Sequence, residues 1–83
     1  MFNEETKLKI NKVIAEKLGV DLSAVTPEKK LKTDFSSDSL DNIEIVMELE
    51  DTFNIEIPDE DVDGHEDCTV QEVYDYIEKR LDA

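Results

Sequence analysis

The stretch from Thr33 to Glu78 contains no Lys or Arg, although Asp and Glu recur throughout it. Over the whole chain of 83 residues, 9 basic side chains stand against 23 acidic ones, which gives a formal net charge of −14. Apolar residues in the same stretch recur at helical rather than alternating spacing. A fold for this chain must therefore bury one side of each helix and leave the carboxylates in water. Repulsion among those carboxylates predicts a marginal, salt-sensitive fold.

The charge also limits the partners of the chain. Nucleic acids and anionic membranes are disfavoured, because binding them needs clustered Lys and Arg. A basic protein surface or a cation is the natural complement. The sequence shows no signal-peptide pattern and no apolar run of about 20 residues, so we expect a cytoplasmic protein without membrane insertion. The single cysteine, Cys68, excludes an internal disulfide and a four-cysteine zinc site.

The pattern predicts one all-α domain over residues 1–83, a bundle of three main helices plus one short third helix. The first helix is expected to run from Asn3, as its N-cap, to Leu18, with Gly19 closing its end. Residues 20–38 lack sustained periodicity and are expected to form a long loop between the first two helices.

The second helix is expected to begin at Asp38 or Ser39 and to end at residue 53 or 54. A short helix over about 59–63 should follow, stopped by a glycine. The last helix should start near Thr69, whose side chain can form a reciprocal cap with Glu72. Its expected buried face consists of Val70, Val73, Tyr74, Ile77 and Leu81.

The tetrapeptide Asp38-Ser39-Leu40-Asp41 resembles the start of the second helix in bacterial acyl carrier proteins, a family whose members carry D-S-L there. Other segments similar to that family follow in its order, and together they span nearly the whole chain. These segments are residues 13–20, 43–50, 57–60, 69–71 and 75–77.

The resemblance implies that Ser39, next to Asp38, carries a covalent 4′-phosphopantetheine arm. It further implies that acyl intermediates are held on this arm as thioesters and delivered to the separate enzymes of fatty acid biosynthesis. A specialised carrier for polyketide or other lipid assembly is the nearest alternative.

The chemistry of Ser39 fits that role. A hydroxyl at a helix start lies near free backbone N–H groups, and a phosphodiester there would be an anion at the positive end of the helix dipole. The simpler interpretation is that Ser39 or Asp38 only caps the helix. Ser39 has no adjacent base, because the single histidine is His65 in a loop, and no G-x-S-x-G elbow surrounds it. We therefore expect no enzymatic activity from the chain itself.

The second helix carries acidic residues at steps of three and four, with no Lys or Arg between them, which predicts an unbroken acidic strip. The resemblance implies that basic patches of phosphopantetheinyl transferase, acyltransferases and the synthesis enzymes dock on this strip of a monomer. Leu40 and Met47 would add apolar contact, although Met47 could instead lie in the core and the acids could form an ordinary solvated face. The acidic candidates are Asp38, Asp41, Glu44, Glu48 and Asp51.

The resemblance also implies a cleft for the acyl chain between the second helix and the short third one. Packing in the core explains the same residues equally well. The candidates are Ile45, Leu49, Ile57 and Val62, with Leu31 as a further one.

Two segments depart from the family pattern. Phe35-Ser36-Ser37 replaces the usual Leu-Gly-Ala before D-S-L, so a glycine is lost and two hydroxyls are gained. The stretch 61–68 is about two residues longer than usual, which affects the third helix and the mouth of the cleft.

The same region suggests a calcium loop over 59–70 as a rival function. Asp59, Asp61 and Asp63, followed by a glycine, match the opening of an EF-hand loop. Its twelfth position should be a bidentate Glu but is Val70, so diffuse cation binding is the milder form of this hypothesis. The neighbouring histidine and cysteine make a poor transition-metal site.

Overall fold

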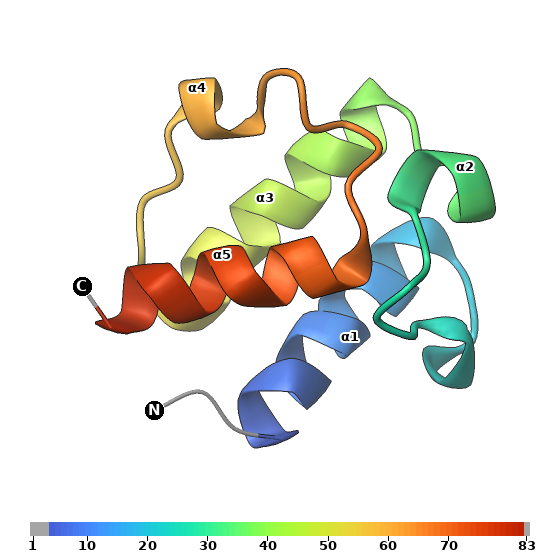
Figure 1. Cartoon of the computed structure of the whole chain (residues 1–83), viewed down its shortest axis with the longest axis horizontal. Coiled ribbons are helices and arrows are strands. Elements are labelled where there is room, and N and C mark those ends of the chain that lie inside the picture. The colour runs from blue at the N-terminus through green and yellow to red at the C-terminus, as the bar shows by residue number, and fades with distance from the viewer. Residues whose placement is uncertain (1–3, 83) are drawn as a thin grey trace.

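Three long helices form the frame of the fold (Figure 1). The computed structural model describes residues 4–82, in which every named element is helical. The long helices are α1 (Glu4–Leu18), α3 (Ser39–Phe53) and α5 (Val70–Asp82), and α1 contacts both of the others. The expected all-α fold and the expected ends of the second helix are confirmed. The proposed N-cap at Asn3 lies outside the described residues.

Local signals explain where these helices begin and end. Gly19 adopts a φ of +67°, and the Val20 N–H donates to the Ala15 carbonyl oxygen at 3.1 Å, which closes α1. Before α5, the Glu72 N–H donates to Thr69 Oγ1 and the Thr69 N–H donates to Glu72 Oε1, both at 3.1 Å. The reciprocal cap expected from the sequence is therefore confirmed.

The segment expected to be a long loop without regular secondary structure contains two short helices, so that expectation was wrong. They are a 3₁₀-helix over Leu22–Ala24 and α2 over Leu31–Phe35. The backbone N–H groups of Lys32 and Thr33 in the first turn of α2 donate to Asp67 Oδ1 at 3.0 and 2.9 Å. This cap comes from a carboxylate 34 residues further along the chain than Thr33, which no local pattern reveals.

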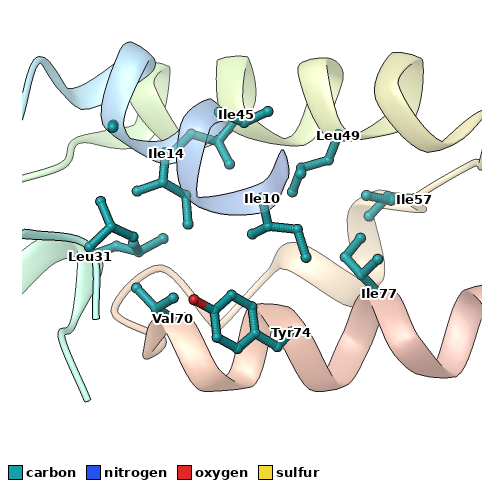
Figure 2. Close-up of a cluster of buried hydrophobic side chains, with 12 residues drawn as sticks. Ile10, Ile14, Leu31, Ile45, Leu49, Ile57, Val70, Tyr74 and Ile77 are labelled. Atoms are coloured by element: carbon teal, nitrogen blue, oxygen red, sulfur yellow. The ribbon is translucent and has the colours of Figure 1, made fainter. Parts of the chain in front are cut away.

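The core lies where α1, α3 and α5 meet. Figure 2 shows side chains of α1 and α3 directed toward those of α5. Leu81 is 40% exposed, so its expected place on the buried face of α5 was wrong; it lies in the last turn of the helix, one turn beyond the core residue Ile77. The labelled core residues are Ile10, Ile14, Leu31, Ile45, Leu49, Ile57, Val70, Tyr74 and Ile77.

α4 (Asp59–Val62) lies at the side of the molecule away from α1 (Figure 1). It is tied to α5 by the Tyr76 hydroxyl, which donates to Asp61 Oδ2 at 2.6 Å. Burial, followed by this hydrogen bond, raises the pKa of Tyr76 to about 12. The hydroxyl therefore remains a donor throughout the neutral pH range.

Ser36 ends α2 in the left-handed region, at φ 58° and ψ 34°. This is the position where the family pattern has glycine. We expect Ser36→Gly to raise the free energy of unfolding by about 0.5–1 kcal/mol, because relief of the left-handed penalty of about 1–2 kcal/mol exceeds the entropy that glycine loses. Urea denaturation measures the change. Ser36→Ala, which retains a Cβ, is the control and should give no gain; equal stability of the two variants would contradict the prediction.

Candidate functional site

Ser39 is the first residue of α3, and the residue that caps this helix is Asp38. Asp38 Oδ1 accepts from the Asp41 N–H at 2.9 Å, and Asp41 Oδ2 accepts from the Asp38 N–H at 3.1 Å. Two carboxylates thus form a capping box and satisfy two of the backbone donors at this end. Asp38 is therefore the residue that caps α3, and the Ser39 hydroxyl is not needed for the cap.

The three serines before and within the first turn differ in their accessibility. Ser39 is exposed, and within the described part of the chain its hydroxyl makes no hydrogen bond. Ser36 is exposed but belongs to the end of α2. Ser37 is only 4% exposed, and its Oγ is buried without a partner. Of the two hydroxyls that the departure from the family pattern adds, one is therefore out of reach of a visiting enzyme.

The acidic strip of α3 is not unbroken, contrary to the expectation from the sequence. Lys17 of α1 reaches Glu48, with 3.7 Å between Nζ and Oε1. The intervening cation comes from another helix, so inspection of α3 alone could not reveal it. Glu44 and Asp51 are exposed and form no ion pair within residues 4–82. Of the acidic residues predicted to form the strip, Glu44, Asp51 and the capping pair Asp38 and Asp41 are thus the ones without an ion pair in the described part of the chain.

An apolar row runs along the exposed side of α3. Leu40, Ile43 and Met47 are each more than half exposed, at steps of three and four. The core interpretation of Met47 is thereby excluded. Ile43 was not among the predicted contact residues, although its spacing from Leu40 and Met47 was visible in the sequence. An exposed apolar row flanked by carboxylates is typical of a protein-binding surface.

A cavity of about 250 Å³ opens on the other side of α3. Leu31, Ile45, Ile57 and Val62 line it, together with side chains that the sequence analysis did not select, among them Asn42. Leu49 does not line it, contrary to our expectation: it is 3% exposed and packs in the core between the long helices. The structure thus brings together residues of α2, α3 and α4 around one largely apolar space.

Cys68 is half-buried in the wall of the same cavity. Burial, together with the charge of Glu72, raises the pKa of its thiol to about 11. The thiol is therefore protonated at neutral pH, which makes it a poor nucleophile and a poor metal ligand.

The calcium loop proposed for 59–70 does not form. Residues Asp59–Val62 are helical, and the carboxylates of Asp61 and Asp67 accept hydrogen bonds from Tyr76 and Thr33 at 2.6 Å each. Within the described residues, no three His, Cys, Asp or Glu side chains gather in a geometry that could hold a metal ion. Among the same residues, no helix combines the length and apolarity that crossing a bilayer requires.

Comparisons with known proteins point to one family. A family model described as "Phosphopantetheine attachment site" matches residues 9–77. The chain is 47% identical over 77 residues to the acyl carrier protein of Rubrobacter xylanophilus, and 45% identical over 77 residues to that of Syntrophobacter fumaroxidans; each match covers 93% of both chains. A solved structure of the acyl carrier protein from Enterococcus faecalis, described as having high thermal stability, is similar with a TM-score of 0.75 and 38% identity. That similarity covers 96% of this chain and 99% of the other.

Proposed function

Because this chain belongs to the acyl carrier protein family and carries acyl groups on phosphopantetheine, we propose that the arm is attached to Ser39. The observation that supports this proposal is the exposed, unbonded hydroxyl of Ser39 at the first residue of α3. A residue whose hydroxyl had to cap the helix would lose that contact on modification. Here Asp38 makes the cap, so Ser39 can be modified without uncapping α3.

The site fits a phosphodiester. The positive end of the α3 dipole favours an anion at its first turn, by about 0.3–1 kcal/mol at an exposed site. The attachment itself needs a separate transferase, because the carboxylates of Asp38 and Asp41 are engaged in the capping box and no described side chain hydrogen-bonds to the Ser39 hydroxyl to take its proton. In that step a base of the transferase takes the hydroxyl proton, the bond from Ser39 Oγ to phosphorus forms, the phosphoanhydride bond of coenzyme A breaks, and the nucleotide half leaves. Once bound, the arm supplies a thiol that holds the acyl group as a thioester.

We propose further that the chain is a cytoplasmic monomer that serves fatty acid synthesis and catalyses no step itself. Its partners would be a phosphopantetheinyl transferase and synthesis enzymes that present basic patches to α3. The exposed row of Leu40, Ile43 and Met47, with Glu44 beside it, supports this docking surface.

The direct test is intact-mass measurement after incubation with coenzyme A and a phosphopantetheinyl transferase. The expected result is the gain of one phosphopantetheine group, and fragmentation should locate it on Ser39. Subsequent acylation of the arm by an acyltransferase of fatty acid synthesis would support the pathway. A chain that gains no mass, or gains it at another residue, would contradict the proposal.

Charge reversal at Glu44 should slow acyl transfer from a synthesis enzyme. Its exposed carboxylate forms no ion pair within residues 4–82, so Glu44→Lys removes steering charge from α3 without breaking one. We expect the second-order rate constant at low salt to fall by about tenfold, and the difference to shrink toward 0.5 M salt. Glu78→Lys on α5 changes the net charge equally and is the matched control. If both variants slow acyl transfer equally, Glu44 has no specific role in docking.

A further inference from the structure

Lys17 of α1 and Glu48 of α3 form an ion pair beside the exposed apolar row. The distance from Lys17 Nζ to Glu48 Oε1 is 3.7 Å, and the two side chains are 26% and 44% exposed. Lys9, by contrast, pairs with Glu5 one turn earlier in its own helix. The Lys17 pair thus brings a cation from one helix to an acidic side chain of another, at a place where a basic partner would seek that carboxylate.

The position of Glu48 along α3 decides what the pair affects. Glu48 follows Met47, which is 58% exposed, so it lies next to the end of the apolar row. Glu44 and Glu48 lie about 7.5 and 13.5 Å along the helix axis from Ser39, at 1.5 Å per residue. A basic patch that follows α3 away from Ser39 therefore meets the free carboxylate of Glu44 first and then one that already holds a cation. Asp51, which forms no ion pair within residues 4–82, lies beyond that occupied carboxylate.

Contact between a partner cation and Glu48 is costly while Lys17 is present. The partner must either displace the lysine or lie beside it, and in the second case two like charges repel. The fold does not need the pair, because an exposed ion pair contributes little to stability and the apolar core already holds α1 against α3. The main consequence of this lysine is therefore expected in docking rather than in folding.

We propose that Lys17 masks Glu48 from basic partner enzymes and concentrates their docking on the end of α3 near Ser39. Enzymes whose basic side chains gather around Ser39 and Glu44 are favoured, and enzymes whose basic patch must reach Glu48 are disfavoured. The inference rests on the proposed docking of basic patches on α3. It makes Lys17, a residue outside the docking helix, a specificity-determining residue for the partners of this chain.

The test measures acyl transfer to the loaded chain by an acyltransferase of fatty acid synthesis, after intact mass has confirmed the load. We expect Lys17→Gln to raise the second-order rate constant at low salt by about threefold, the effect of one opposite charge met at about 7 Å in water. Lys17→Arg keeps the charge and should react like the parent. Lys12→Gln removes an equal charge from an exposed position of the same helix and is the matched control. Equal rate constants for Lys17→Gln and Lys12→Gln would overturn the inference.

A double variant separates masking of Glu48 from a general effect of net charge. In a Glu48→Gln chain, Lys17→Gln should raise the rate constant no more than Lys12→Gln does, because no carboxylate remains to be unmasked. An equal gain with and without Glu48 means that Lys17 acts through net charge alone, and the inference fails. If the rate constant of the parent does not depend on salt, the proposed docking on α3 fails as well, so the two failures are distinguishable. Circular dichroism confirms that each variant keeps its helices.

Discussion

A Ser39→Ala chain gains no phosphopantetheine when it is incubated with coenzyme A and transferase, whereas the parent chain gains one group. The loss is expected to be complete, because the variant lacks the oxygen that bonds to phosphorus. The fold should be unaffected, since Asp38 caps α3 and the Ser39 hydroxyl bonds to no other group within residues 4–82. Intact mass measures the loading, and circular dichroism confirms that the helices persist.

The neighbouring serines provide matched controls for this variant. Ser36→Ala and Ser37→Ala each remove one hydroxyl within three residues of the site, and both should load like the parent. Ser37→Ala should also be more stable by about 1–3 kcal/mol, because it removes a buried hydroxyl that has no partner. If Ser39→Ala still gains phosphopantetheine and one of these controls does not, the serine replaced in that control is the attachment site.

Truncation of Leu49 is expected to have the largest effect on stability. Leu49 is 3% exposed and lies in the core cluster, so Leu49→Ala should lower the free energy of unfolding by about 2–5 kcal/mol. A domain of this length has roughly 4–12 kcal/mol in total, so the variant should lose a large fraction of its stability. Urea denaturation at a fixed salt concentration measures the change.

Met47, two residues earlier on the same helix, is the control for this truncation. It is 58% exposed, and Met47→Ala should change the stability by no more than about 0.5 kcal/mol. Its effect should appear instead as slower transfer by enzymes that dock on α3. If both variants destabilise the chain equally, the assignment of the two faces of α3 is wrong.

Much of the fold could be predicted because its signals are local. Each of these signals consists of residues that are close together in the sequence. They are the apolar spacing along α3, the glycine after α1 and the reciprocal cap between Thr69 and Glu72. The candidate site was similarly accessible, since Asp38, Ser39 and Asp41 are neighbours in the chain. Helix α2 was missed because its N–H groups are satisfied by Asp67, far along the sequence.

The sequence by itself determined the helical class, the place where α3 begins and the identity of the exposed serine as a candidate. Tertiary packing alone decided which apolar residues of α3 became core, with Leu49 inside and Ile43 outside, because burial depends on where α1 and α5 lie. It also paired Lys17 with Glu48 and left Asn42 Oδ1 without a donor. Hydrogen bonds and ion pairs between distant segments depend on how the helices meet, and periodicity along one helix does not encode that.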